Sequence, residues 1–226
     1  MIKYLLLDID DTILDFHKSE HLAIKNTLRD FGIEPTQEVC DLYSRINQAH
    51  WERLERKEIT RPQVLVGRFA VLMETLKVSG DAAACCRRYM ENLTNETHFL
   101  PEAREALEIL SQHYDLYGVS NGNLSVQRGR LAAANISHLF QRIFISEEVG
   151  ADKPDPRFFK VVFDAIPGFD PQKAMIVGDS LTSDILGGIR SGIRTCWINA
   201  KHKQHPEDIC PDYEIEKLSQ LMDLLR

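Results

Sequence analysis

The 226-residue sequence has no apolar run of the roughly 20 residues that a membrane-spanning helix requires. Its first apolar stretch, Ile2–Leu7, contains a lysine and ends at Asp8, so it is also too short for the apolar segment of a secretory signal. The five cysteines form no Cys-x-x-Cys pair, and their odd number fits no closed set of disulfides. These absences predict a cytoplasmic protein with reduced thiols and no membrane partner.

An excess of basic charge is also absent. Lys and Arg total 27 against 34 Asp and Glu, which gives a formal net charge of −7 with His neutral. Because proteins that bind nucleic acid polymers usually carry an excess of positive charge, this balance argues against such a partner. An anionic small molecule still fits, provided that the positive charge near it is local.

We expect a monomer or a weak homodimer.

Short apolar runs recur along the chain, and most lack the alternation of a half-exposed strand. These runs are Ile2–Ile9, Leu116–Val119, Ile143–Ile145, Ala174–Val177 and Cys196–Ile198. Helical patterns separate the last four. Strands that alternate with helices predict an α/β fold, a doubly wound, mostly parallel Rossmann-like sheet with helices on both faces. The charged stretch Asn199–Pro211 is expected to be a solvated loop.

The strand pattern is interrupted between Asp15 and Thr97, where helical segments follow one another. One runs to Gly32, another begins after Thr36, and a third runs to Gly80. We therefore predict two domains. Residues 1–14 and 98–226 form the α/β core, and residues 15–97 form an inserted all-helical cap.

The first apolar run ends in a cluster of acidic side chains. Asp8, Asp10 and Asp11 lie within a few residues of one another and are followed by Thr12. In an open α/β sheet, ligands bind outside the carboxyl ends of the strands. Like charges this close raise one another's pKa, so the cluster indicates a cation, and Mg²⁺ prefers such hard oxygen ligands. The alternative is a solvated turn that caps the next helix, which could be the whole role of Asp11.

A second acidic pair follows the run Ala174–Val177. Asp179 comes directly after Gly178, and Asp184 lies a few residues further along. If the two strands are neighbours, Asp179 completes a metal site with Asp8. For Asp184 two readings stand equally: a place at the metal site through water, or the cap of the helix that begins near Ile185.

Two other segments supply what a phosphate group needs. Ser120 and Asn121 end the run Leu116–Val119 with a hydroxyl and turn amides, and Lys153 stands beside a proline with one compact positive charge. Taken singly, Ser120 reads as a turn residue and Lys153 as a surface lysine. Taken together and in this order, they fit the recognition of an anionic phosphate.

Four motifs in this order resemble those of the haloacid dehalogenase-like superfamily. They are Asp-x-Asp-x-Thr at Asp8–Thr12, the strand-end Ser120, Lys153 before a proline, and Gly-Asp at Asp179 with the second acid Asp184. The resemblance covers the chain from Asp8 to Asp184. The helical block lies where that family inserts its cap.

The resemblance implies a Mg²⁺-dependent hydrolase of small-molecule phosphomonoesters. Asp8 would attack phosphorus and become an aspartyl phosphate. Asp10 would protonate the leaving oxygen and later deprotonate the hydrolytic water, with Thr12 helping in orientation. The implied metal set is Asp8, Asp10 through its carbonyl, Asp179 and Asp184, and the implied phosphate-binding set is Thr12, Ser120, Asn121 and Lys153.

The same resemblance separates branches of the family. Dehalogenating members lack an acid at the position of Asp10, and phosphonate-cleaving members use a cap lysine that nothing in this sequence singles out. Sugar phosphomutases tend to carry Gly and Val at the positions of Asp11 and Thr12. The residues present therefore favour a phosphatase.

The segments Asp8–Phe16, Val119–Gly122 and Gly178–Ile185 are similar to the subgroup of nucleotidases that hydrolyse nucleoside 5′-monophosphates, including noncanonical pyrimidine ones. Phe16 and Trp51 are candidates for stacking on a base. Tyr43 and Asn47 are expected to pack the core of the cap itself.

Other functions stay open at this point. One is a phosphatase of another small phosphometabolite, such as a sugar phosphate or phosphoglycolate. Another is a weakly active member that binds a phosphometabolite or a partner protein. A third is transfer of the phosphoryl group to a second metabolite.

Overall fold

The computed structural model describes residues 1–225, and the chain divides into two compact units. One unit comprises Met1–Phe16 and the chain from His98 onward, and the other is His17–Thr97. The helical unit thus begins two residues later than the predicted boundary after residue 14. Hydrogen bonds explain the difference, because the amide of Asp15 donates to the carbonyl of His98 (2.9 Å) and the amide of Phe16 donates to Asp11 (2.9 Å).

The α/β unit is built on one parallel sheet. In the described part of the chain its strand order is β3-β2-β1-β4-β5-β6, and every neighbouring pair is parallel. The strands are β1 (Tyr4–Leu7), β2 (Asp115–Ser120), β3 (Arg142–Ile145), β4 (Ala174–Gly178), β5 (Arg194–Ile198) and β6 (Tyr213–Ile215). The predicted α/β fold with a parallel sheet is confirmed.

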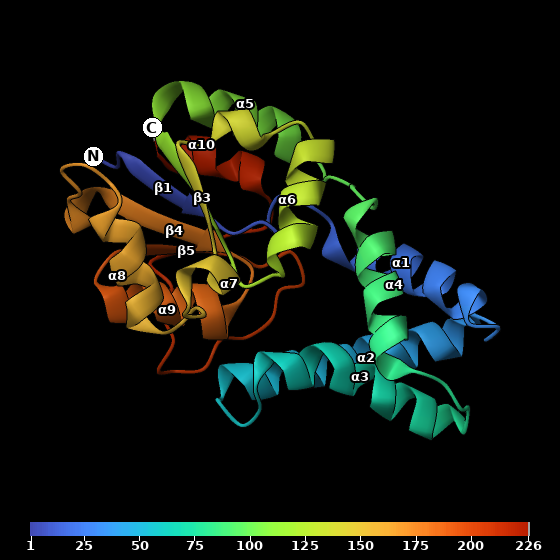
Figure 1. Ribbon diagram of the computed structural model, residues 1–226. Coiled ribbons are helices and arrows are strands. Elements are labelled where there is room, and N and C mark those ends of the chain that lie inside the picture. The colour runs from blue at the N-terminus through green and yellow to red at the C-terminus, as the bar shows by residue number, and fades with distance from the viewer. Residues whose placement is uncertain (226) are drawn as a thin grey trace. The chain divides into compact units, whose positions relative to one another are not determined.

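Both faces of the sheet are covered by helices (Figure 1). Leu5 and Leu7 of β1 pack into one apolar cluster with α5 (Ala103–His113), whereas Tyr4 and Leu6 pack into another with α8 (Pro156–Asp164). Because successive side chains of a strand point to opposite faces, a strand buried on both faces is apolar throughout. This is why the five longer strands could be recognised from the sequence.

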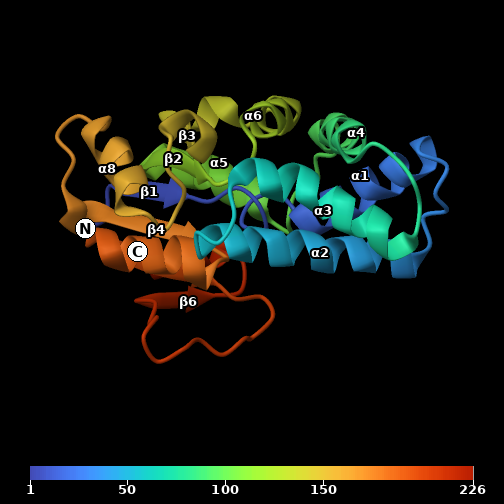
Figure 2. The same ribbon diagram turned by 60° about the horizontal axis from the view of Figure 1, so that its bottom comes forward.

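The remaining elements of this unit connect and cover the strands. They are α6 (Leu124–Ala133), α7 (Ser146–Val149), α9 (Leu186–Ser191), α10 (Leu221–Leu224), a π-helical turn at Leu181–Ile185 and 3₁₀ turns at Ser137–Leu139, Pro171–Lys173 and Leu218–Gln220. The strand β6, which follows the long loop after β5, was not predicted (Figure 2). Its three residues are too few to produce a hydrophobic pattern.

The unit His17–Thr97 is entirely helical. Its helices are α1 (Phe16–Asp30, which begins one residue before the unit), α2 (Gln37–Glu55), α3 (Arg61–Leu76) and α4 (Ala82–Thr94). Thr36 caps α2 as predicted, since its hydroxyl accepts from the amide of Val39 at 3.3 Å. The helix α3, by contrast, ends at Lys77 in the left-handed conformation and not at Gly80. No helix in the described chain is long and apolar enough to span a membrane.

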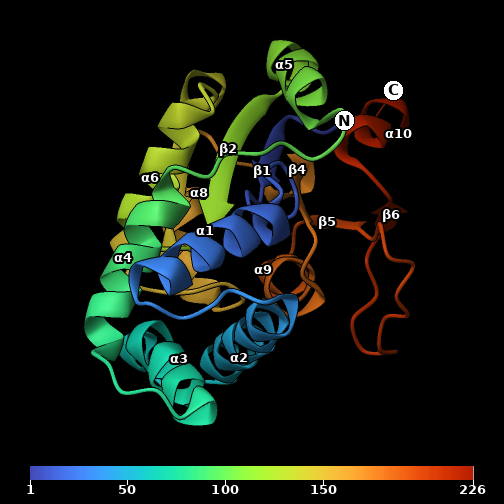
Figure 3. The ribbon, with the colours of Figure 1, turned by 90° about the vertical axis from the view of Figure 1, so that its right-hand side faces the viewer.

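A cluster of rings forms the centre of the helical unit, where α2 and α3 lie side by side (Figure 3). Tyr43, Phe69 and Tyr89 are fully buried, with ring centroids 5.3 to 5.5 Å apart. The expectation that Tyr43 and Asn47 pack inside this unit agrees with their burial.

A buried polar chain accompanies these rings. The Asn47 amide nitrogen donates to Glu20 Oε1 at 2.5 Å, and its amide oxygen accepts from Arg68 Nη1 at 2.6 Å. Glu20, Asn47 and Arg68 are each less than 5% exposed. Asn47 therefore links a carboxylate and a guanidinium that are both almost fully buried.

Replacing this link should weaken the helical unit. We expect Asn47→Ala to lower the free energy of unfolding by about 2–4 kcal/mol, because both buried charges lose a hydrogen-bond partner. Asn26→Ala, an exposed position on α1, should cost about 0.5 kcal/mol or less. Urea unfolding followed by circular dichroism measures both. Equal midpoints for the two variants would contradict the role of Asn47.

Candidate active site

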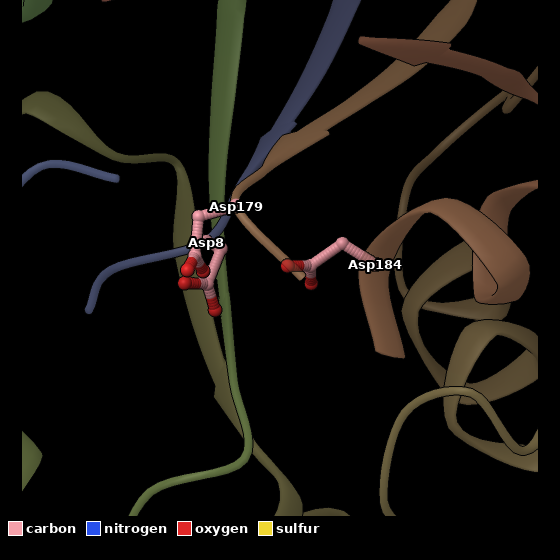
Figure 4. Close-up of side chains that lie close together, drawn as sticks. All are labelled: Asp8, Asp179 and Asp184. Atoms are coloured by element: carbon pink, nitrogen blue, oxygen red, sulfur yellow. The ribbon is translucent and has the colours of Figure 1, made fainter. Parts of the chain in front are cut away.

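Three carboxylates from two neighbouring strands meet at the carboxyl edge of the sheet. Leu7 of β1 lies opposite Val177 of β4, and the amide of Asp8 donates to the carbonyl of Val177 at 3.0 Å. Asp8 and Asp179 therefore leave the sheet side by side, and Asp184 approaches them from the turn that follows β4 (Figure 4). Oxygen atoms of the three side chains lie within 4.8 Å of one another.

Lys153 provides the positive charge of this cluster. Its Nζ atom lies 2.6 Å from Asp8 Oδ1, 2.6 Å from Asp184 Oδ1 and 2.9 Å from the carbonyl oxygen of Val119. An ammonium group has three protons, so these acceptors use its full capacity. Since Lys153 is only 1% exposed, its charge acts on the carboxylates with little screening by water.

The cluster is short of positive charge. Three carboxylates and one ammonium give a formal charge of −2. Burial raises the pKa of Asp8 to about 8, against the opposing effect of Lys153 and with further contributions from Asp184 and Asp10. Burial and the charge of Asp8 also raise the pKa of Asp179 well above its usual value. Burial by itself lowers the pKa of Lys153, but Asp184 and Asp8 outweigh this and raise it.

This donor set fits a divalent cation. Carboxylate oxygens are the hard ligands that Mg²⁺ and similar ions take, and a cation among them would remove the repulsion that raises their pKa values. Asp8, Asp179 and Asp184 are the residues able to hold it.

Gly178, at the end of β4, makes room for Asp184. A Cβ atom on this glycine would lie 2.2 Å from Asp184 Oδ2, a distance at which no side chain fits. Asp184 lies inside the π-helical turn, whose N-cap is Ser180, and its Oδ2 accepts from the backbone amide of Ser180 at 3.2 Å. Asp184 thus lies beside Asp8 and Asp179 and also accepts from the backbone of the N-cap residue, and its place at a metal site through water stays a prediction.

The turn after β1 directs the other two acids elsewhere. Asp11 has a φ of 54°, and its side chain accepts from the amide of Phe16, so it caps α1 as the alternative reading proposed. The Asp10 carboxylate turns to α6, where it accepts from Gln127 Nε2 at 2.6 Å and from the guanidinium of Arg130. Gln127 and Arg130 were not singled out in the sequence.

The predicted phosphate-binding residues lie in the same unit, with different partners. Thr12 is fully buried, and its hydroxyl has no hydrogen-bond partner among the described residues. The Ser120 hydroxyl accepts from the amide of Gly122 at 3.0 Å. The Asn121 side chain bonds the backbone of Lys153 on both sides, at 2.8 and 2.9 Å. The Asn121 side chain thus holds Lys153 in place, a role that its position in the sequence did not indicate.

A tryptophan that sequence reasoning missed supports Asp179. Trp197 on β5 is 1% exposed, and its indole nitrogen donates to the carbonyl oxygen of Asp179 at 2.9 Å. In the sequence Trp197 reads as one more apolar strand residue, because only the strand order β4-β5 brings it beside Asp179.

The two aromatic candidates for substrate contact lie in different units. Phe16 is half-buried in the α/β unit, with the guanidinium carbon of Arg130 5.7 Å from its ring centroid. Trp51 is half-buried in the helical unit, where the guanidinium carbon of Arg61 lies 5.5 Å from its ring centroid. A role for either ring in binding stays a prediction.

Comparison with known proteins shows the family of the chain. The family described as haloacid dehalogenase-like hydrolase matches residues 5–198. The HAD-hydrolase YfnB of Bacillus subtilis is 38% identical over 221 residues, which cover 98% of this chain and 94% of that protein. The pyrimidine 5′-nucleotidase PynA of Streptococcus pneumoniae is 35% identical, with 99% of this chain and 94% of that protein covered.

The chain belongs to the haloacid dehalogenase-like hydrolases. The crystal structure of B. subtilis YfnB, described as bound to magnesium, superposes on this hydrolase with a TM-score of 0.96 and 37% identity, and covers 100% of this chain and 99% of that one. An L-2-haloacid dehalogenase from Xanthobacter autotrophicus superposes with a TM-score of 0.80 at 17% identity over 100% and 99% of the two chains, and so shares the fold alone.

We expect Mg²⁺ to bind the acidic cluster of this hydrolase more tightly as the pH rises from about 6 to about 8. Below the raised pKa of Asp8, about 8, the metal-free protein holds a proton that the cation must displace. The apparent affinity should rise by up to about tenfold per pH unit for each displaced proton and level off above pH 8. Calorimetric titration at several pH values measures this.

The same raised pKa gives the sign of the stability effect. The folded Asp8 keeps its proton up to about pH 8, whereas in the unfolded chain it loses the proton near the usual aspartate pKa of 3.8, so the metal-free protein loses stability as the pH rises between these two values. Mg²⁺ should therefore raise the melting temperature most at alkaline pH. Asp179→Asn should abolish this increase and Asp208→Asn, in an exposed loop, should retain it. Stronger binding at acidic pH would contradict the assignment.

Proposed function

We propose that this hydrolase is a Mg²⁺-dependent phosphomonoesterase that acts on nucleoside 5′-monophosphates, pyrimidine ones in particular, through an aspartyl phosphate on Asp8. The observation that carries the proposal is the pairing of Asp8 with Lys153 at 2.6 Å beside the acidic cluster. Such a pairing places a nucleophile next to positive charge for phosphate oxygens.

The first step forms a bond between an Asp8 carboxylate oxygen and phosphorus. The bond between phosphorus and the 5′-oxygen breaks, and the leaving oxygen takes a proton from Asp10. In the second step water attacks phosphorus, gives its proton to Asp10, and the bond between phosphorus and Asp8 breaks. Inorganic phosphate leaves and both carboxyl groups return to their initial state.

The remaining groups bind and orient. A phosphate oxygen would replace one of the three present acceptors of Lys153. The hydroxyls of Thr12 and Ser120 and the backbone of Asn121 would bind the other phosphate oxygens, and the Thr12 hydroxyl is a buried group with no other partner in the described chain. Mg²⁺ would be held by Asp8, Asp179 and the Asp10 carbonyl, with Asp184 beside them. When bound, this ion would neutralise negative charge on the phosphoryl group.

The presence of Asp10 favours phosphoryl transfer over dehalogenation. An alkoxide needs a proton to leave, whereas a halide ion does not. The nucleotide substrate is supported by relatives whose names specify pyrimidine 5′-nucleotidases, PynA and also YjjG of Escherichia coli, which is 29% identical over 98% of this chain and 97% of that protein.

Asp8→Asn should abolish phosphate release while the protein stays folded, because an amide oxygen is a poor nucleophile for phosphorus. Asp115→Asn is a matched control, since Asp115 lies at the opposite end of the neighbouring strand and pairs only loosely with Lys3 (3.7 Å). It should retain the turnover of the unchanged protein. Phosphate release at the normal rate by Asp8→Asn would overturn the nucleophile assignment.

The substrate class can be tested by measuring phosphate release from a panel of esters. We expect the highest kcat/KM with pyrimidine nucleoside 5′-monophosphates, including noncanonical bases, and lower values with purine nucleotides. A preference for sugar phosphates or phosphoglycolate would replace the nucleotide assignment and keep the phosphatase. Analysis of products in the presence of free nucleosides separates hydrolysis from transfer to a second metabolite.

A further inference from the structure

The helix α6 carries two buried polar side chains that the steps above do not use. Gln127 and Arg130 are 1% and 0% exposed. They stand three residues apart, so they lie on the same face of the helix. Both reach across more than a hundred residues of sequence to one carboxylate, that of Asp10.

Each oxygen of Asp10 has its own donor. Gln127 Nε2 lies 2.6 Å from Asp10 Oδ2, and Arg130 donates to Oδ1. The two donors are themselves connected, because Arg130 Nη1 donates to Gln127 Oε1 at 3.1 Å. A carboxylate held at both oxygens by linked donors has little freedom to rotate.

Gln127 also connects Asp10 to the end of β2. Its Nε2 atom lies 2.7 Å from Ser120 Oγ, so the two protons of one amide serve Asp10 and Ser120. The loop beside it is shaped for this side chain, since a Cβ atom on Gly122 would lie 2.7 Å from both Cγ and Nε2 of Gln127. The amide is thereby confined from two sides.

Asp10 is partly exposed to solvent, whereas its donor Arg130 is not. The Asp10 side chain is 26% exposed, whereas the side chain of Arg130 is 0% exposed. The carboxylate is therefore open to a ligand while its donors are shielded behind it. A buried guanidinium is costly to retain for stability alone, because apolar residues of similar volume often serve a core at least as well.

We propose that Gln127 and Arg130 are positioning residues that hold the Asp10 carboxyl group in line with the leaving oxygen. Gln127 in addition holds the Asp10 carboxyl group at a fixed position relative to the Ser120 hydroxyl. The inference rests on the proposed function, in which Asp10 supplies the proton to the leaving oxygen. Proton transfer needs heavy atoms within hydrogen-bond reach, so a mobile Asp10 would transfer the proton less often.

The test compares two leaving groups of different basicity. A nucleoside or glycerol alkoxide needs the proton of Asp10 to leave, whereas 4-nitrophenolate leaves readily without it. The value of kcat/KM reports only the steps up to the first irreversible one, the release of the leaving group, so later hydrolysis of the aspartyl phosphate does not enter. Gln127→Met and Arg130→Met remove the donors and keep much of the side-chain volume.

We expect kcat/KM for uridine 5′-monophosphate or glycerol phosphate to fall by about 10²-fold in both variants, the lower end of what general acid catalysis contributes. For 4-nitrophenyl phosphate the loss should be about tenfold or less. Arg130→Lys keeps a positive donor and should recover part of the loss on the alkyl ester. Arg128→Met, on the same helix but exposed and paired with Glu148, should change neither value.

An equal loss with both esters, or no loss with the alkyl ester, would overturn the inference. Asp10→Asn separates this failure from failure of the proposed function. If Asp10→Asn loses activity selectively on the alkyl ester and the α6 variants do not, Asp10 remains the general acid, and the inference that Gln127 and Arg130 position it is wrong. If the unchanged protein hydrolyses neither ester, or Asp10→Asn shows no selectivity, the proposed function and this inference both fail. Thermal melting identifies a variant that does not fold. If Arg130→Met does not fold, the kinetics of Arg130→Lys decide whether Arg130 positions Asp10.

Discussion

The contacts of the Lys153 ammonium are the interaction on which the site depends. Its three acceptors come from three separate segments: Asp8 after β1, the carbonyl of Val119 on β2, and Asp184 after β4. Asn121 bonds the Lys153 backbone on both sides, so the position of this one nitrogen atom is set from several directions. Without it, Asp8 and Asp184 would be buried carboxylates of the same sign with no countercharge, an arrangement that costs several kcal/mol.

A second countercharge gives the neighbouring acid a different environment. Asp8 is paired with Lys153 inside the acidic cluster, whereas Asp10 is paired with Arg130 on α6 and remains partly open. Two carboxylates that stand two residues apart can perform different tasks only when their surroundings differ. The turn after β1 creates that difference, because it sends the Asp8 side chain towards Lys153 and the Asp10 side chain towards α6.

The main elements of the fold were predictable because burial on both faces makes a strand continuously apolar. The runs around Leu5, Leu116 and Ile176 became β1, β2 and β4 in one parallel sheet. The prediction was wrong where the local signal was weak or ambiguous. The strand β6 has only three residues, and α3 ends at Lys77 because a lysine takes the left-handed conformation that Gly80 was expected to provide.

The sequence by itself determined which acids and which hydroxyl stand at the ends of the strands, and therefore which of them meet at one edge of the sheet. A short apolar run followed by Asp8, Ser120 or Asp179 is a local pattern and can be read without coordinates. Only the tertiary structure decided the partners of these groups: Gln127 and Arg130 for Asp10, Trp197 for Asp179, and Asn121 for the Lys153 backbone. The physical reason is that a hydrogen bond depends on distance in space, and these residues come from segments up to 120 positions apart.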